Sequence, residues 1–346
     1  MITLPTSVAQ AVRAEGTFRD GGTDQTELRH RGVATGPVID LRDVPNLATI
    51  ERTPEGGLRL GARCTLTQVA THPDVLAGYP GLAQAAGGLA TPQIRARASL
   101  AGSLLQEVRC WYLRSPQFRC KKQGGLVCLA RKGDARFHAA YDRGPCIAPH
   151  PSTMAVALWA FDARVTVQSA AGSDERDLPT LLGDGSNARQ THAVAPGELL
   201  TAVTLPPPVE GEHSAYHRTI HRARAEWPLV EALVRVVPAA DGTLSGMHLF
   251  AGGIANRPLA YPEIASQIDG RRADDEVWNA ILDNLPADAD LPQAAYKGRL
   301  LPVTLRDTLA KALAGSPAAG WGAPAGDETE EETDDTEDGP EEGATP

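Results

Sequence analysis

Four cysteines close together in the chain carry the clearest chemical signal in the sequence. Cys110, Cys120, Cys128 and Cys146 are separated by nine, seven and seventeen residues. Four thiolates on one segment are the full ligand set of a four-iron, four-sulfur cluster. Zinc segments usually contain a close Cys-x-x-Cys pair, which is missing here, and disulfide frameworks are typical of small secreted chains. A solvated basic loop whose cysteines merely pack is the alternative interpretation.

Basic residues are frequent in the same segment, where they would stabilise thiolates and a negatively charged cluster. They are Arg109, Arg114, Arg119, Lys121, Lys122, Arg131 and Lys132. The fifth cysteine, Cys64, ends an expected strand, and we interpret it as a buried packing thiol.

Two glycine segments in the first half of the chain could hold an anion. Residues 18–32 read FRDGGTDQTELRHRG, and residues 93–107 read QIRARASLAGSLLQE. Glycine lets backbone N–H groups approach an anion closely, and neighbouring hydroxyl groups add further donors. Neither segment matches GxGxxG or GxxxxGK[ST], so neither a Rossmann dinucleotide site nor a P-loop is indicated. Each segment is also compatible with an ordinary turn.

Alternating strand and helix patterns would position these segments in the first 206 residues. Helices are expected to begin after Thr65 and Ser152, which are good N-cap residues, and the first should run through TLTQVATHPDVL. Three prolines at 206–208 end the last strand and mark a domain boundary. Short strands are expected at residues 38–44, 58–64, 165–168 and 199–205.

Beyond the prolines the pattern predicts an α+β unit. A hairpin turn is expected at Asp241–Gly242, and two amphipathic helices should follow. The first helix should bury Val277, Ile281 and Leu285 on one face. The second should bury Leu305, Leu309 and Leu313 and end near Gly315.

Composition limits the function classes. The chain has 346 residues, 42% of them hydrophobic, and no apolar run approaches the ~18 residues of a membrane helix. The missing apolar run means that no membrane role is indicated. A nucleic-acid role is not indicated either, because no basic stripe with interleaved aromatic residues lies outside the cysteine segment. We expect a cytoplasmic location, since no signal peptide is evident. Export to the periplasm together with a signal-bearing partner stays open.

The net charge of −10 comes mainly from the end of the chain. Eleven acidic residues and no lysine or arginine lie between Asp327 and Glu342, so the remaining chain is nearly neutral. Such a segment cannot bury enough apolar surface to order itself, and we predict a disordered acidic tail at 319–346.

In their order and spacing, these motifs resemble the FAD-binding subunit of the xanthine dehydrogenase family of molybdenum hydroxylases. In that family, loops of the types AGGTD and TIGGN hold the flavin pyrophosphate from two sides. DGGTD at 20–24 and SLAGS at 99–103 stand in their places. The resemblance spans about residues 10–315 and includes QIR at 93–95, HPSTMAVAL at 150–158, ELLTAVTLPPP at 198–208, AYHRTIHRARAEWPLV at 215–230 and AYKGRLL at 295–301.

The cysteine segment narrows the resemblance to the flavin subunits of three-subunit bacterial aldehyde oxidoreductases, which carry a 4Fe–4S cluster. A loop of the form GNLLQRxRC precedes the other ligands there, and a last cysteine lies just before the HPSD helix. GSLLQEVRC ends here at Cys110, and CIAPHPS begins at Cys146. The resemblance therefore assigns Cys110, Cys120, Cys128 and Cys146 to the cluster.

The fold implied by the resemblance is α/β followed by α+β: a two-part FAD-binding domain of the PCMH type and a smaller C-terminal domain. The first domain would cover residues 1–206, divided at about residue 55, with the cysteine-rich loop at 109–147. The second, of the CO dehydrogenase flavoprotein type, would cover 212–318. The residues implied to bind FAD are Phe18, Arg19, Asp20, Gly21, Gly22, Thr23, Asp24, Gln25, Ser99, Ala101, Gly102, Ser103, Thr153 and Arg218.

Four residues depart from the family pattern. Ser103 stands where Asn is usual, Thr153 where Asp is usual, and Arg218 where Lys is common. Asp20 replaces a small residue, and its carboxylate would repel phosphate unless it points away. These departures predict a weaker hold on FAD.

The activity implied is that of an oxidoreductase subunit. A partner with a molybdenum cofactor would oxidise an aldehyde or related substrate, and a 2Fe–2S partner would pass electrons through FAD to an acceptor. No catalytic acid or base on this chain is then required. The alternatives are a scaffold subunit that has lost its flavin and a free-standing flavin oxidase.

Overall fold

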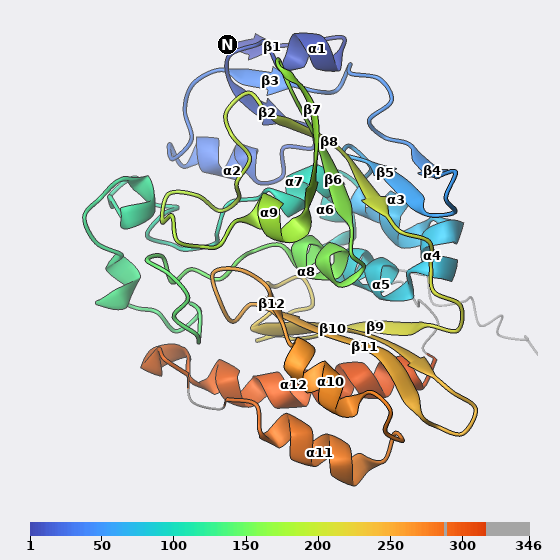
Figure 1. Ribbon diagram of the computed structural model, residues 1–346. Coiled ribbons are helices and arrows are strands. Elements are labelled where there is room, and N and C mark those ends of the chain that lie inside the picture. The colour runs from blue at the N-terminus through green and yellow to red at the C-terminus, as the bar shows by residue number, and fades with distance from the viewer. Residues whose placement is uncertain (287–288, 316–346) are drawn as a thin grey trace, which may run out of the picture.

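The computed structural model describes residues 1–286 and 289–315. Three sheets, each built from one part of the chain, follow one another down the molecule (Figure 1). We call the parts the N-terminal unit (β1 to β3), the central unit (β4 to β8) and the C-terminal unit (β9 to α12). The expected α/β arrangement followed by an α+β unit is confirmed. The acidic tail expected at 319–346 lies outside the described residues.

The N-terminal unit is a small parallel sheet with strand order β1-β3-β2. Ile39 at its centre is fully buried. The strand expected at 38–44 is shorter than predicted, because the chain leaves the sheet after Asp40. Its elements are β1 (Ile2–Thr3), α1 (Val8–Ala11), β2 (Thr17–Arg19), α2 (Gln25–His30) and β3 (Val38–Asp40).

The central unit is a five-stranded antiparallel sheet, ordered β4-β5-β8-β6-β7, with helices on one face. The division of the FAD-binding domain is expected at about residue 55. β4 lies before that position but pairs with β5, so it belongs to the central sheet. The elements are β4 (Ile50–Arg52), β5 (Leu58–Gly61), α3 (Leu66–Thr71), α4 (Pro73–Gly78), α5 (Pro80–Gly88), α6 (Pro92–Arg95), α7 (Leu100–Leu104), η1 (Lys121–Gln123), η2 (Leu129–Arg131), α8 (Thr153–Ala160), β6 (Arg164–Ser169), β7 (Gly172–Asp177), α9 (Leu178–Leu182) and β8 (Leu199–Leu205).

The helix expected after Thr65 begins as predicted but is divided in two. Thr65 and Gln68 form a reciprocal capping box at the start of α3. His72 then adopts an extended conformation, and a second helix begins at Pro73. The residue before a proline is disfavoured in the helical conformation, which explains the break.

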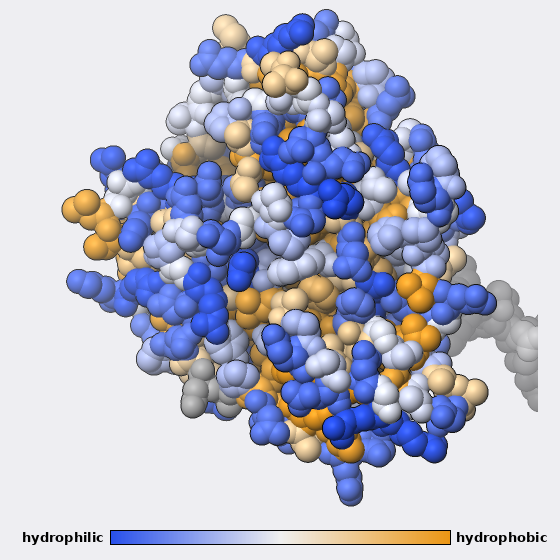
Figure 2. Space-filling view, in the orientation of Figure 1, coloured by the Kyte–Doolittle hydropathy of each residue, from blue (hydrophilic) through white to orange (hydrophobic). Residues whose placement is uncertain are grey.

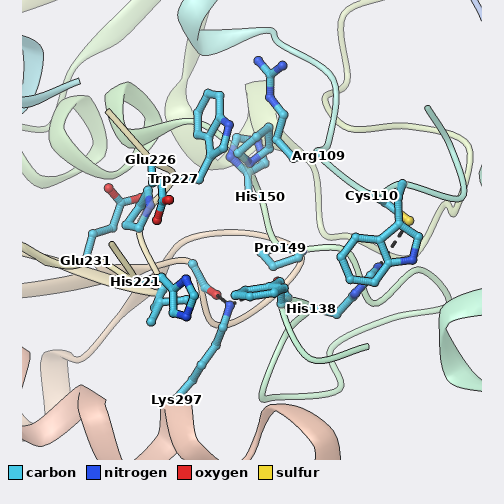
Figure 3. Close-up of a pocket in the computed structure, with 16 residues that line it drawn as sticks. Arg109, Cys110, His138, Pro149, His150, His221, Glu226, Trp227, Glu231 and Lys297 are labelled. Atoms are coloured by element: carbon cyan, nitrogen blue, oxygen red, sulfur yellow. Dashed lines mark hydrogen bonds between the residues drawn. The ribbon is translucent and has the colours of Figure 1, made fainter. Parts of the chain in front are cut away.

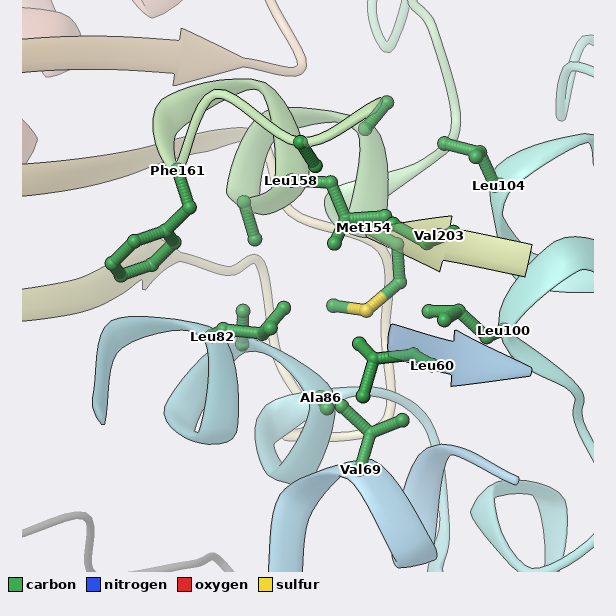
Figure 4. Packing of buried hydrophobic residues seen from close by; sticks show 14 of the residues in the cluster. Leu60, Val69, Leu82, Ala86, Leu100, Leu104, Met154, Leu158, Phe161 and Val203 are labelled. Atoms are coloured by element: carbon green, nitrogen blue, oxygen red, sulfur yellow. The ribbon is translucent and has the colours of Figure 1, made fainter. Parts of the chain in front are cut away.

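Helix α8 is buried on all sides and joins the central and C-terminal units. Its N-terminus is capped by Ser152, as predicted, and it packs against α5, α7, β10 and β11. Met154 and Leu158 lie among Leu60, Leu82 and other apolar side chains (Figure 4). A helix that is apolar all round is expected in such an enclosed position.

The C-terminal unit is an antiparallel sheet, ordered β12-β11-β10-β9, with α8 on one face and α12 on the other. The predicted hairpin turn at Asp241–Gly242 joins β10 to β11, and Gly242 has a φ of 83°. The elements are β9 (His213–Thr219), β10 (Val230–Pro238), β11 (Leu244–Gly252), β12 (Leu259–Ala260), α10 (Pro262–Ile268), α11 (Asp275–Asp283), η3 (Pro292–Ala294) and α12 (Tyr296–Leu313).

The buried face of α11 differs from the prediction. Leu285, just beyond the end of α11, is buried as predicted, whereas Val277 and Ile281 lie at the edge of the interface. Trp278 and Leu282 are buried in their place. On α12 the predicted Leu305 and Leu309 are buried, and Leu313 is half-buried.

The face of the molecule in Figure 2 is mainly hydrophilic, with apolar side chains scattered over it. No helix in residues 1–286 and 289–315 combines the length and hydrophobicity that crossing a membrane would need.

Candidate cofactor site

The first glycine loop connects β2 to α2 and is pressed against the second. Gly22 has a φ of +70°, a left-handed conformation that glycine adopts readily. A Cβ on Gly21 would lie 1.8 Å from the carbonyl oxygen of Arg97, which precedes the second loop. Glycine at position 21 therefore allows the two loops to meet.

The second glycine loop is the start of α7. Ser99 is the N-cap of this helix, and its Oγ accepts a hydrogen bond of 3.3 Å from the N–H of Gly102. A Cβ on Gly102 would lie 2.9 Å from the same oxygen, which leaves little room for a side chain there. Ser103 is buried on the following turn, where its N–H bonds to the carbonyl oxygen of Ser99.

Both loops line one cleft of about 190 Å³ between the N-terminal and central units. The predicted residues that line it are Phe18, Arg19, Asp20, Gly21, Gly22, Thr23, Asp24, Gln25, Ser99, Ala101 and Gly102. Residues 198–200, at the start of β8, complete the wall. Segments separated by about eighty residues are thus brought to one site.

The charges at the first loop are paired within the protein. The carboxylate of Asp20 accepts a hydrogen bond of 2.7 Å from Arg63 Nε, so a cation balances the negative charge expected to repel phosphate. Arg19 and Arg42 both bind the buried Asp40, and these hydrogen bonds hold the pKa of that carboxyl well below its usual range. Sequence reasoning missed Arg63, which comes from the end of β5.

Asp24 ties the first glycine loop to the cysteine loop, residues 109–147. Its Oδ1 lies 2.7 Å from nitrogens of both Arg109 and Arg114, and its Oδ2 accepts a hydrogen bond of 3.0 Å from the N–H of Glu107. Arg114 is buried and also binds Glu27 at 2.9 Å. The start of the cysteine loop is thereby fixed against α2.

The four cysteines of this loop face one small, mainly apolar cavity. Cys110, Cys120, Cys128 and Cys146 line it together with Val108, Leu113, Leu129, Ala130 and Ala148. All are free thiols, as is Cys64, which is buried as expected but lies three residues beyond the end of β5. Burial raises the pKa of Cys110 to about 11 and also raises that of Cys146. In the described part of the chain, no three His, Cys, Asp or Glu side chains are grouped to hold a single metal ion.

The far side of the cysteine loop is held by residues around the start of α12. Gln293 exchanges two hydrogen bonds of 2.9 Å with the backbone of Gly133 and Ala135. Tyr296 donates to the carbonyl oxygen of Arg136 at 2.9 Å. The loop is therefore clamped between the first and the last described parts of the chain.

A second cavity, of about 290 Å³, lies between the cysteine loop and the C-terminal unit (Figure 3). Trp227 and Arg109 lie at one side of it, with the guanidinium 4.2 Å from the ring centre. Cys110, His138 and Lys297 lie at the other. The cavity thus combines aromatic side chains with polar groups.

Four ionisable groups that line this cavity are deeply buried, and burial is the main cause of each pKa shift. It lowers the pKa of His138 to about 4, of His150 to about 3 and of Lys297 to about 7. It raises the pKa of Glu231. In the described residues, neither His138 Nδ1 nor His150 Nε2 has a hydrogen-bond partner. Burial therefore disfavours the charged form of each group, and the two imidazoles retain unused hydrogen-bonding capacity.

Thr153 and Arg218 lie behind this second cavity and line neither it nor the first cleft. Thr153 donates a hydrogen bond of 2.5 Å to Glu231, which also accepts one of 2.7 Å from Tyr216. Arg218 donates to the carbonyl oxygens of Glu226 and Arg224. Lys297 lies in the AYKGRLL segment of the resemblance, but neither Lys297 nor Glu231 was predicted as a site residue, because each reaches the site from an otherwise ordinary strand or helix.

A family model described as the FAD binding domain in molybdopterin dehydrogenase matches residues 4–208. The chain belongs to this family. As a molybdopterin dehydrogenase chain it carries the family's FAD-binding domain, which confirms the predicted family and its flavin cofactor. It is 33% identical over 306 residues to the aldehyde oxidoreductase FAD-binding subunit PaoB of Escherichia coli (strain K12), covering 86% of this chain and 91% of that one. It is 22% identical over 263 residues to the nicotinate dehydrogenase FAD-subunit of Eubacterium barkeri, covering 76% and 74%.

Solved structures share the fold of this molybdopterin dehydrogenase chain. The Cu,Mo-CO dehydrogenase in a cyanide-inactivated form matches with a TM-score of 0.71 and 20% identity, over 91% of this chain and 98% of the other. The quinoline 2-oxidoreductase of Pseudomonas putida 86 matches with a TM-score of 0.68 and 17% identity, over 91% and 96%. The predicted fold class is therefore confirmed.

Proposed function

We propose that the chain is the FAD-binding, electron-transfer subunit of a multi-subunit molybdenum hydroxylase that oxidises an aldehyde or related substrate. The observation that carries this proposal is the meeting of the two glycine loops in one cleft of an FAD-binding domain. The likeness to PaoB, a subunit of an aldehyde oxidoreductase, supports the substrate class. The partners would be a large molybdenum-cofactor subunit and a small 2Fe–2S subunit.

The residues of the first cleft suit the pyrophosphate of FAD. Gly21, Gly22 and Gly102 keep the backbone free of side chains, and Thr23 and Ser99 add hydroxyl groups. The arginine at position 63 neutralises Asp20, so the cleft can accept an anion. FAD supplies the capacity to take up two electrons and release them to an acceptor.

The second cavity suits the flavin ring, because it is walled by aromatic and proline side chains. Arg109 separates it from the first cleft, and its guanidinium would have to shift from Asp24 or Trp227 to let one ligand span both. Thr153 and Arg218 would act on the ring indirectly, through Glu231 and Glu226, which line the cavity. Ser103 would support the second glycine loop from behind.

The four cysteines of the loop are proposed to bind a 4Fe–4S cluster. A cube takes four thiolate ligands around one body, and the four cysteines line one shared cavity. That cavity measures about 10 Å³, so the loop would have to widen to admit the cluster. Lys121 and Lys122, which also line the cavity, would offset the negative charge of the thiolates and the cluster. A zinc ion and a Cys110–Cys146 disulfide are the competing assignments for the same thiols.

The flavin assignment can be tested with two glycine variants of matched backbone strain. Gly22 and Gly32 have φ values of +70° and +71°, and a Cβ on Gly32 would meet no atom within 4 Å. We expect Gly22→Val to lose most bound FAD and Gly32→Val to retain it, measured as flavin per folded protein. Equal flavin in both variants would refute the placement, and a wild type purified without flavin would favour the scaffold role.

The cluster assignment predicts about four iron and four sulfide per chain in anaerobically purified protein. Replacing Cys120 with Ser should remove this iron, whereas Cys64→Ser is the control and should leave it unchanged. Stoichiometric zinc in the wild type, or a disulfide between Cys110 and Cys146 in freshly isolated protein, would overturn the assignment.

A further inference from the structure

Two side chains separate the second cavity from the small cavity that the four cysteines line, which we call the cluster cavity. Among the described residues, Cys110 and His138 are the two that line both spaces. His138 Nε2 lies 3.2 Å from Cys110 Sγ, which is hydrogen-bond distance for sulfur (Figure 3). Any group in the larger cavity would therefore face the cluster cavity across this pair.

We propose that His138 donates a hydrogen bond from Nε2 to the sulfur of Cys110 and thereby raises the reduction potential of the cluster. The proposal rests on the cluster and flavin positions given under Proposed function. A hydrogen bond to a cluster sulfur draws negative charge from it, which favours the reduced and more negative state. His138 would be a positioning residue, since it acts through the thiolate of Cys110.

The direction of the hydrogen bond follows from the two ring nitrogens. A metal-bound thiolate has no proton to give, so Nε2 must carry the hydrogen. Nδ1 is then a bare acceptor, which agrees with its lack of a partner. The opposite tautomer would leave a buried N–H unsatisfied, at a cost of about 1–3 kcal/mol.

The backbone holds the imidazole in this position from several sides. The N–H of His138 bonds to the carbonyl oxygen of Ala135 at 2.9 Å, and the next residue, Ala139, bonds to Ile147 at 2.9 Å. Lys297 Nζ donates to the carbonyl oxygen of Phe137 at 3.3 Å. The ring of Trp111 packs edge-on against the imidazole, with ring centres 5.2 Å apart. The side chain is only 2% exposed, so water does not compete for the sulfur.

The experiment compares two replacements of His138 in the complete chain or its complex. His138→Leu removes the donor, and His138→Gln keeps an N–H donor on a side chain of similar reach. The cluster midpoint potential is followed by redox titration with electron paramagnetic resonance, and iron is counted in each sample. His248→Leu, which alters an imidazole lining neither cavity, is the control.

We expect His138→Leu to retain its iron and to shift the cluster equilibrium about tenfold toward the oxidised state, the effect of one hydrogen bond, or about 59 mV for one electron. The midpoint potential of His138→Gln should stay closer to that of the wild type, and the potential of the His248→Leu control should not change. An unchanged potential in His138→Leu, an equal shift in both variants, or loss of iron from His138→Leu alone would overturn the proposal. A wild type without iron would instead refute the cluster itself.

Discussion

At the scale of single residues, one departure from the family pattern has an internal partner. Thr153 stands where the resemblance leads one to expect aspartate, and its hydroxyl is bonded to the buried carboxyl of Glu231. The carboxyl group that Thr153 meets at the second cavity therefore belongs to β10.

Restoring the expected aspartate should consequently harm this chain. Thr153→Asp would set a second carboxyl against Glu231, whose pKa burial already raises, and we expect a loss of about 2 kcal/mol in unfolding free energy. Adding Glu231→Gln should recover most of that loss in a double-mutant cycle measured by denaturant unfolding. Full stability of the single variant would show that the two side chains do not interact.

Lys297 should make stability depend on pH. Burial lowers the pKa of its ammonium group from 10.5 to about 7. Between these values the unfolded chain holds a proton that the folded chain has released, so this group adds stability as pH rises through the window and costs stability below it. Raising the pH from 7 to 9 should therefore increase the thermal midpoint of the wild type relative to Lys297→Met. The exposed Lys132→Met is the control, and parallel pH profiles for all three proteins would contradict the expectation.

At the scale of elements, the cysteine loop depends on ion pairs that its buried Arg114 makes with residues of α2 and its N-cap. Arg114 binds Asp24 and Glu27 and also donates to the carbonyl oxygens of Val108 and Glu107. Arg114→Met would remove the buried one of the two arginines that bind Asp24, with Arg109 left in place, and Arg31 would remain on Glu27. We expect a loss of about 2 kcal/mol in unfolding free energy, the effect of losing hydrogen bonds to charged groups, together with faster loss of iron on dialysis. Arg136→Met, which breaks an exposed pair in the same loop, should change neither. Comparable losses in the two variants would count against this anchor.

Elements defined by local patterns were predicted from sequence, whereas their mutual packing was not. The capping box at Thr65, the hairpin at Asp241–Gly242 and the glycine loops each depend on residues close in the chain. On α11 two apolar faces, one with Ile281 and one with Leu282, differ by a single residue. Contact with α10 and α12 selects the second, and this contact is not encoded in the helix itself.

In the candidate site, too, features set by local sequence were predicted and those set by packing were not. Its glycines and cysteines were found because their types and spacing are distinctive. Arg63, His138 and Glu231 were missed because each is a common residue whose role comes from a partner elsewhere in the chain: Asp20, Cys110 and Thr153 respectively. Tertiary structure alone brings these pairs together.

At the scale of the whole molecule, the proposed division of labour predicts that the isolated chain oxidises no aldehyde. We propose its cavities as sites for a flavin and a cluster, and the proposal assigns substrate oxidation to a partner with a molybdenum cofactor. Expressed with candidate large and small partners, the chain should co-purify as a complex that turns over aldehyde, measured by reduction of an artificial dye. Turnover by the chain alone would favour the free-standing oxidase.

The clamp on the cysteine loop also sets an order of events during synthesis. Cys146 emerges about 150 residues before Gln293 and Tyr296, which hold the far side of the loop. At ribosomal rates of about 5–20 residues per second, roughly seven to thirty seconds separate them. During that interval the loop can already bond to Ile254 through the N–H groups of Ala140 and Tyr141, but the contacts of Gln293 and Tyr296 are missing. If the proposed cluster binds these thiols, the far side of its loop would close only when those two residues reach it.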